Sequence, residues 1–348
     1  MKTKWLFASA AIIGFAPGIA PGSARAQTTY TVLVGAQDTS LGADVDAFFP
    51  DSLQIHVGDT VHWQRNANEI HTVSFLAGTP IPDLIIPAPD GLPSPLMLNP
   101  VAAYPTAPDN GQYNGTTFAN SSIIGPDPGQ AQSFDLTFTT PGTYNYVCLV
   151  HGVPMSGKII VVDNQQDIPS PSEVDRQATR SINSALAQVP IVFALASFSL
   201  PPPIANPDGT TTYQVLIGYT FGQLDLLHFF PDQLAVNPGD TVVFTLSDAD
   251  MAPHTVTFLN GNMSPDDVVP VPQDNGPPLL VFNPAVLFPQ NPGQPLTKDG
   301  IYSSGLFVPG GTTTSFSFQI GDITGEMQFQ CLLHDNSGML GSLYVVPR

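Results

Sequence analysis

The sequence predicts an all-β protein made of two tandem Greek-key β-sandwich domains, joined by a connector that contains a helix. The chain has 348 residues, and at about 150 residues per domain two domains are expected. Its 37 prolines, 30 glycines and 11% charged residues leave little room for long solvated helices, and short apolar runs between turn residues are typical of strands. A long internal repeat is the third observation, because its unit has the size of a whole domain.

The first 26 residues have the pattern of an export signal. Lys2 and Lys4 precede an apolar stretch over Trp5–Phe15, and Ala24-Arg25-Ala26 is typical of a cleavage site. Prolines interrupt the apolar stretch well short of the roughly 20 residues that a bilayer span needs. We therefore expect a periplasmic or extracellular protein whose mature chain begins at residue 27 and contains no membrane span.

The repeat divides the mature chain into domain 1 at residues 27–165 and domain 2 at residues 205–348. Its matching segments are Thr29–Gly35 with Thr212–Gly218, Phe48–Asp51 with Phe229–Asp232, and Gly58–Val61 with Gly239–Val242. Within each domain, runs such as Ser133–Phe138 and Ser315–Phe318 alternate between polar and apolar residues. This alternation predicts half-buried strands of an antiparallel sandwich.

Residues 166–204 break the strand pattern and form the predicted connector. Ser170, Pro171 and Glu173 provide a cap, a first-turn proline and a capping-box glutamate. We expect one amphipathic helix that ends near Gln188, with its apolar face formed by Val174, Ala178, Ile182, Ala185 and Leu186. The apolar run Val189–Phe198 is too short to cross a bilayer, so we expect it to pack against a domain.

Each domain contains one cysteine, followed by a histidine and a methionine. The two runs are Cys148-Leu149-Val150-His151-Gly152-Val153-Pro154-Met155 and Cys331-Leu332-Leu333-His334-Asp335-Asn336-Ser337-Gly338-Met339. A second histidine, His71 or His254, lies 77 residues before each cysteine, and these His and Cys positions repeat between the halves at an offset of 183. Two cysteines in an exported protein would ordinarily suggest a disulfide, but this context favours two metal sites.

A thiolate, two imidazoles and a thioether have a specific metal preference. A trigonal His2Cys set with a weak axial methionine is the geometry of blue, or type 1, copper in electron transfer. The sequence therefore predicts two copper ions, one held by His71, Cys148, His151 and Met155 and one by His254, Cys331, His334 and Met339.

Both halves resemble cupredoxins of the plastocyanin and azurin kind. The second has the Cys-x2-His-x4-Met loop, preceded by Pro253-His254-Thr255-Val256, and the first has a loop one residue shorter, preceded by Gly142–Val147. The resemblance implies a blue copper protein that carries electrons. It also implies that His151 and His334 are electron exits near apolar docking patches, formed by Leu149, Val150, Val153 and Pro154 in one loop and Leu332, Leu333, Met339 and Leu340 in the other.

Other functions of tandem cupredoxin domains remain open alternatives. Copper nitrite reductases and small laccases place further histidines beside the type 1 ligands, whereas Val147 and Gln330 precede the cysteines here and the chain has no His-x-His pair. The three other histidines, His56, His62 and His228, are too few for a trinuclear cluster, and we expect them to be surface or packing residues. Copper storage or delivery is a further alternative, although the Met-rich or His-rich tracts that would favour it do not occur.

The charge of the chain bears on its partners. Removal of residues 1–26 leaves six basic against 28 acidic residues, a net charge of −22. Such a field repels nucleic acid and attracts cationic proteins. We therefore expect redox partner proteins, namely cationic cytochromes or membrane oxidoreductases, and no nucleic acid.

Overall fold

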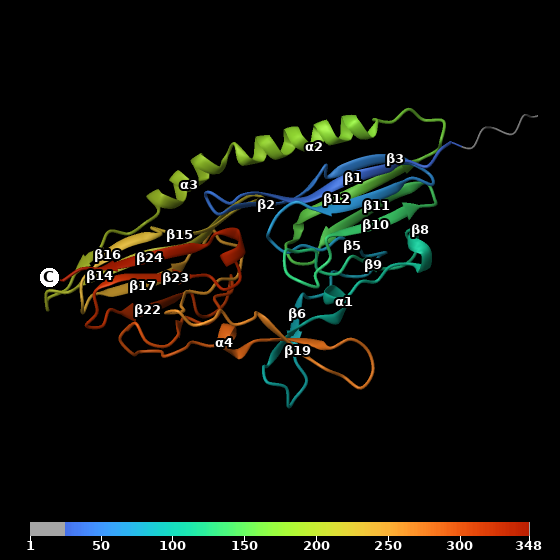
Figure 1. The fold of residues 1–348 in the computed structure, drawn as a ribbon. Helices are drawn as coiled ribbons and strands as arrows, with labels where there is room; N and C mark the ends of the chain where they lie inside the picture. Colours follow the sequence, from blue (N-terminus) through green and yellow to red (C-terminus); the bar gives the residue numbers. More distant parts are fainter. Residues whose placement is uncertain (1–24, 348) are drawn as a thin grey trace, which may run out of the picture.

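The computed structural model describes residues 25–347, and the predicted export signal lies almost entirely outside them. Domain 1 is a sandwich of two sheets, as predicted (Figure 1), but it is not purely antiparallel, because three of its strand pairs are parallel. One sheet contains, in spatial order, β2 (Ala43–Phe49), β1 (Thr29–Asp38), β4 (Thr60–Arg65), β10 (Ser133–Phe138) and β8 (Gln112–Tyr113). The other contains β3 (Ser52–His56), β12 (Gly152–Val162), β11 (Gly142–Cys148), β5 (Ser74–Phe75) and β9 (Ala119–Asn120).

Domain 2 repeats this arrangement. Its first sheet contains β15 (Leu224–Phe230), β14 (Thr211–Phe221), β17 (Thr241–Leu246) and β22 (Ser315–Gln319), with β13 (Ile204–Ala205) beside β14. Its second contains β16 (Gln233–Val236), β24 (Leu340–Val345), β23 (Gly325–Gln330), β18 (Thr257–Phe258) and β21 (Tyr302–Ser303). The protein is thus mostly β, with two sandwiches of the same construction.

Aromatic side chains fill both sandwiches. Trp63 of β4 is fully buried and contacts the rings of Phe75, Phe134, Phe138 and Tyr146. In domain 2, the buried Phe244 occupies the corresponding place among Phe229, Phe318 and Phe329. Such rings bury large apolar areas, so each domain has a core of its own.

The connector is helical, and its two helices lie along one side of both domains (Figure 1, top). Helix α2 (Pro171–Leu186) begins at the predicted capping box, in which the Ser170 backbone N–H donates to Glu173 at 2.7 Å. It packs on β1 and β2, and α3 (Val189–Phe198) packs on β15 through Val192 and Ala196. By length and composition alone, Pro171–Phe198 could also cross a membrane; in this structure it lies across the two sandwiches instead.

The domains are joined more closely than the sequence indicates. Strand β15 of domain 2 pairs antiparallel with β2 of domain 1, so one sheet runs through both domains. A further sheet, formed by β19 (Val268–Val271), β20 (Leu279–Phe282), β7 (Leu96–Leu98) and β6 (Ile85–Pro87), joins them through the β20–β7 pair. Short helices complete the structure: α1 (Pro100–Ala103), η1 (Asp109–Gly111), α4 (Pro284–Leu287) and η2 (Asp335–Ser337).

Candidate metal centres

The ligand candidates of domain 1 come from two neighbouring parts of one sheet. Cys148 ends β11, and a tight turn brings His151 back before β12 begins at Gly152. His71 is held by a two-way backbone bridge to Ile124, with N···O distances of 2.9 and 2.7 Å. The hydroxyl of Thr72 accepts a hydrogen bond from the Leu149 backbone N–H at 2.7 Å, which fixes the His71 segment against the cysteine loop.

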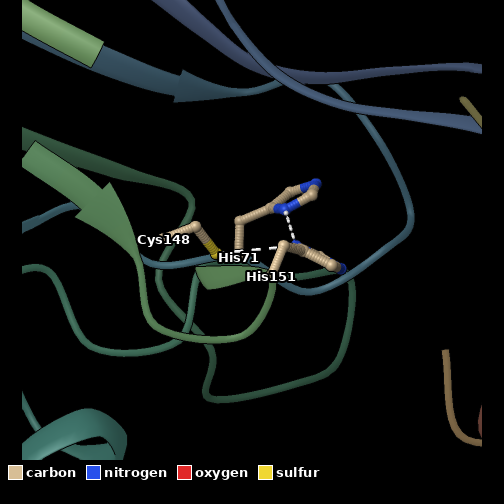
Figure 2. Close-up of side chains that lie close together, drawn as sticks. All are labelled: His71, Cys148 and His151. Atoms are coloured by element: carbon tan, nitrogen blue, oxygen red, sulfur yellow. Dashed lines mark hydrogen bonds between the residues drawn. The ribbon is translucent and has the colours of Figure 1, made fainter. Parts of the chain in front are cut away.

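The three donor atoms of domain 1 converge on one point (Figure 2). Nδ1 of His71 lies 3.2 Å from Nδ1 of His151, and the latter lies 3.6 Å from Sγ of Cys148. His71 and Cys148 are fully buried. Met155 is fully buried in the same core cluster as Cys148. We call this group site 1.

Domain 2 contains the equivalent group, site 2. Its Nδ1 atoms, from His254 and His334, lie 3.0 Å apart, and Sγ of Cys331 lies 3.7 and 3.5 Å from them respectively. Met339 is fully buried in the core cluster of Cys331, and the Leu332 N–H donates to the Thr255 hydroxyl at 2.8 Å. The structure therefore brings the predicted His and Cys residues together in each domain.

The surroundings of Cys148 favour a thiolate. Burial opposes ionisation of this thiol, but the imidazoles of His151 and His71 outweigh it and hold the pKa of Cys148 well below its usual value. The backbone N–H of Thr72 also donates to Cys148 Sγ at 3.3 Å, as that of Thr255 does to Cys331 Sγ at 3.4 Å. Both cysteines are free, so the disulfide alternative is excluded.

These donor sets fit copper. At site 2, two imidazole nitrogens and a sulfur form a triangle with sides of 3.0 to 3.7 Å. At site 1, two sides measure 3.2 and 3.6 Å, and all three donor atoms lie within 4.8 Å of one another. Facing nitrogen lone pairs at such a separation repel one another unless a proton or a cation lies between them, and soft thiolate with imidazole selects copper. The two histidines and the cysteine of each site would hold the ion. A buried methionine from the same loop is available as the weak axial ligand.

The remaining histidines lie apart from both sites. Nε2 of His56 contacts the Gln166 carbonyl at 2.6 Å, His62 pairs with Asp135 at 2.8 Å, and His228 packs on Phe193 and Phe230. Their predicted assignment to surface or packing positions is confirmed.

Sequence reasoning missed the acidic residues that face the outer nitrogens of the ligand histidines. Nε2 of His254 lies 2.8 Å from Oδ2 of Asp250, within the same domain. Nε2 of His151 lies 3.6 Å from Oδ1 of Asp46, and Nε2 of His334 lies 3.5 Å from Oε2 of Glu69, which belongs to the other domain. The available signal was the position of Glu69 and Asp250, two and four residues before the first ligand histidine of each half.

The two sites differ at the His71 and His254 positions. Gly35 lies against His71, and a Cβ added at Gly35 would come within 2.6 Å of His71 Nε2. At the equivalent Gly218, a Cβ would come within 2.5 Å of the Asp250 carboxylate. Ala67 stands where Asp250 stands in the repeat. Nε2 of His71 and Nε2 of His254 both lack a hydrogen bond among the described residues, but only His254 has a carboxylate at this position, in an ion-pair contact of 2.8 Å. Site 2 therefore has a carboxylate that site 1 lacks.

A buried acidic cluster lies between the domains. Asp44 and Asp225 are paired residues of β2 and β15, and with Asp46 they project from the sheet face opposite α2 and α3. Burial, followed by repulsion from Glu69 and Asp46, raises the pKa of Asp44 well above its usual value, and burial likewise raises the pKa of Asp46, Glu69 and Asp225. Oδ1 of Asp44 is buried without a hydrogen-bond partner in the described structure.

The predicted docking patches require a correction. His334 is only 4% exposed and faces domain 1, so it is not an exit at an exposed apolar surface. Leu149 and Leu332 are also 4% exposed, because their side chains belong to the domain interior. Val153 and Leu340 are exposed. The error arose because the resemblance is to single domains, whose ligand loops have no second domain beside them.

Comparison with known proteins agrees with a cupredoxin assignment. Residues 31–162 match the family described as copper binding proteins, plastocyanin/azurin family. Chloroplastic plastocyanin of Hordeum vulgare is 28% identical over 151 residues, which cover 41% of this chain and 76% of that protein. Plastocyanin of Nostoc punctiforme is 27% identical over 163 residues, covering 46% and 91%.

Solved structures match single domains of the chain. The Cu(I) form of a mutant amicyanin has a TM-score of 0.24 and 22% identity, and covers 40% of this chain and 86% of its own. A mutant plastocyanin of fern has a TM-score of 0.22 and 22% identity, covering 38% and 99%.

The fold and the donor sets define a copper-binding cupredoxin with two candidate type 1 sites. Domain 1 matches the plastocyanin/azurin family, and the two plastocyanins are distant relatives of the chain. The family match covers domain 1, and domain 2 is related to it by the internal repeat of both sequence and strand order.

Proposed function

We propose that this chain is an exported blue copper protein that carries single electrons between redox partners, with one type 1 copper in each domain. The observation that carries the proposal is the pair of buried His2Cys triangles, each with a buried methionine in its loop. Copper in such a set supplies a one-electron couple that cycles with little rearrangement.

The protein would contribute rigidity and the exclusion of water. Backbone bridges to Ile124 and Phe307 anchor His71 and His254. Threonine hydroxyls accept from the Leu149 and Leu332 backbone N–H groups, and backbone N–H groups donate to both cysteine sulfurs. Donor atoms fixed in this way hold one geometry in both oxidation states, which keeps the reorganisation energy of electron exchange low.

A carrier is favoured over a copper oxidoreductase of the nitrite reductase or laccase type. The histidines outside the two sites are engaged elsewhere, with Gln166, Asp135 and the Phe193–Phe230 pair. Five of the six His and Cys donors are buried, and the His151 side chain is 16% exposed, whereas a catalytic copper needs a position open to its substrate. Copper storage or delivery is the second candidate, because buried thiolates also retain Cu(I).

The acidic surface supports a cationic partner. A net charge of −22 in the mature chain attracts basic proteins over a distance set by ionic strength. Cationic cytochromes or membrane oxidoreductases of the exported compartment have the required chemistry, and nucleic acid does not.

The decisive experiment follows the exchange of electrons with a cationic c-type cytochrome. The copper-loaded mature protein is mixed with the reduced cytochrome in a stopped-flow instrument, and its blue absorption is followed at several salt concentrations. A carrier bleaches rapidly, recovers on mixing with an oxidant and reacts more slowly at high salt. A storage protein would give no reversible blue form, and consumption of oxygen or nitrite would indicate an enzyme. Cys148→Ala and Cys331→Ala are matched variants that each remove one site.

A further inference from the structure

The ligand loop of each site contacts the other domain. The loop of site 2 contacts domain 1, where the Asn68 side chain donates to the Asn336 carbonyl at 2.8 Å. The loop of site 1 contacts domain 2 in return, where the Gln223 side chain donates to the Pro154 carbonyl at 2.8 Å. An external redox partner would approach a copper site at its ligand loop. In this chain the other domain contacts that loop instead.

One residue links the ligands of both sites. Glu69 places Oε2 3.5 Å from Nε2 of His334, a ligand candidate of site 2. Its backbone continues through Ile70 to His71, a ligand candidate of site 1. The route between the two ligand sets therefore contains a single through-space gap, and all its other steps follow covalent bonds. Electron tunnelling weakens far more steeply across a gap than along bonds, so such a route conducts well.

The contact is built into the fold. Strands β2 and β15 pair directly across the boundary, β7 and β20 pair on the other side, and the connector helices pack on both domains. Glu69 itself is nearly buried, with 11% of its side chain exposed. A fixed contact keeps the two groups at a permanently high effective concentration, so no docking step limits the exchange.

From this geometry we infer that the two copper sites form one intramolecular electron-transfer pair, with Glu69 as the bridge between His334 and His71. In the exchange, one copper is oxidised from Cu(I) to Cu(II) while the other is reduced from Cu(II) to Cu(I). The step needs no further oxidant or reductant, and the first electron comes from the external partner. The inference rests on the proposed electron-carrier function and specifies how that function uses two sites.

The direction of transfer follows from the difference between the sites. The Asp250 carboxylate beside His254 makes that imidazole a better donor, because outer partners of this kind raise ligand basicity. A stronger donor stabilises Cu(II) and lowers the reduction potential. At the equivalent position beside His71 the chain has Ala67 instead of a carboxylate, so electrons should pass from site 2 to site 1.

The test measures intramolecular equilibration after a brief reducing pulse. The parent protein carries Met339→Leu, so that site 2 has its own EPR signal while Cys331, His254 and His334 remain. A radiolytic pulse reduces a small fraction of the copper, and rapid-freeze EPR follows the redistribution at several protein concentrations. We expect a first-order phase whose rate does not depend on protein concentration and that is absent when Cys331→Ala removes site 2.

Variants of the bridge identify the route. Glu69→Ala should slow this phase about tenfold, since the rate depends on how closely the two groups are held. Glu69→Gln keeps the length and heavy-atom shape of the bridging side chain, and Asp44→Asn alters a carboxyl of the same acidic cluster outside the route, so both should stay near the parent rate. If Glu69→Ala does not fold, the distance between the two oxidised copper centres of the parent is measured instead from their dipolar coupling. A single, narrow distance supports a fixed intramolecular electron-transfer pair.

Several results would overturn the inference. One is an equilibration rate that scales with protein concentration, and another is an unchanged rate in folded Glu69→Ala. A broad range of intersite distances, as for freely oriented domains, would be a third. Failure of the proposed function itself would appear earlier, as the absence of any blue band before the pulse.

Discussion

Asp250 places Oδ2 2.8 Å from Nε2 of His254, and the same position in the first repeat is Ala67. Burial opposes a charge on this imidazole, but Asp250 and Cys331 outweigh it and raise the pKa of His254 to about 10. Burial, with a smaller effect from His151, lowers the pKa of His71. The same four ligand types therefore lie in two different electrostatic environments.

Removal of Asp250 should raise the reduction potential of site 2. We expect a rise of about 60 mV for Asp250→Ala, which is a tenfold change in a one-electron equilibrium constant. The measurement is a spectroelectrochemical titration in a Cys148→Ala background, so that only site 2 contributes. Asp248→Ala, on the exposed part of the same loop, is the control and should leave the potential unchanged. Equal potentials in both variants would refute the assigned effect of Asp250.

Gly35→Ala should disrupt site 1 alone. The added methyl would meet Nε2 of His71 at 2.6 Å, and Gly35 has a φ of +72°. Gly58→Ala is the matched control, because Gly58 has a φ of +89° but nothing within 4 Å of the added Cβ. Both variants incur a backbone cost of about 1–2 kcal/mol, yet only Gly35→Ala should lose the blue absorption of site 1. Retention of both bands in Gly35→Ala would show that His71 is not held as described.

Met155 and Met339 should affect the reduction potential and EPR signal of the copper sites but contribute little to the stability of the fold. Met155→Leu and Met339→Leu conserve side-chain volume, so each should cost less than about 1.5 kcal/mol of stability. If the thioether is the weak axial ligand, its loss shifts the potential and the EPR signal of that site while copper stays bound. Spectra identical to those of the unaltered protein would exclude these methionines as ligands.

The acidic domain boundary should make stability depend on pH. Burial, and then the nearby Asp335 and Asp127, raises the pKa of Asp267 to about 7. Its value in the unfolded chain is about 4, so the folded protein holds the proton more tightly. The stabilisation is complete below about pH 4 and is lost as the pH rises through about 7.

Asp267→Asn should therefore reduce the fall in Tm of the copper-free protein between pH 4 and pH 8. The difference between the two Tm profiles isolates Asp267 from the other titrating groups. Parallel profiles would show that Asp267 does not titrate in this range.

One apolar cluster contains residues of β2, of β15 and of both connector helices. Because it belongs to both domains, we expect the two domains to unfold together. Leu226 is fully buried among residues of both domains, and its backbone pairs with Ala43 across the boundary. Leu226→Ala should cost about 2–5 kcal/mol in a single denaturant transition. Leu195→Ala, on the exposed side of α3, should cost far less. Two separate transitions, or equal costs, would contradict a joint core.

Much of the fold and both donor sets could be predicted from the sequence because they depend on local patterns. Alternation identified strands such as Ser133–Phe138, the capping box placed the start of α2, and the Cys-His-Met spacing identified the ligand loops. These features repeat along the chain, so each half supported the interpretation of the other.

The domain arrangement could not be predicted because it depends on contacts between residues far apart in the sequence. Nothing in the alternation of Ala43–Phe49 distinguishes a strand paired with domain 2 from one at an open edge. The proximity of Glu69 to His334 follows only from that pairing. For the same reason the expected exit at His334 was wrong, since domain 1 covers that face of domain 2.

The central claim is that each domain holds one type 1 copper, and an anaerobic copper titration of the mature protein tests it most directly. Visible absorption and EPR spectra are recorded at each addition, with Cys148→Ala and Cys331→Ala as single-site references. The account predicts two equivalents of copper, an intense charge-transfer band and narrow copper hyperfine splitting, with about half the band in each reference variant. Binding of fewer than two equivalents, or of Cu(I) without a stable coloured Cu(II) form, would contradict it.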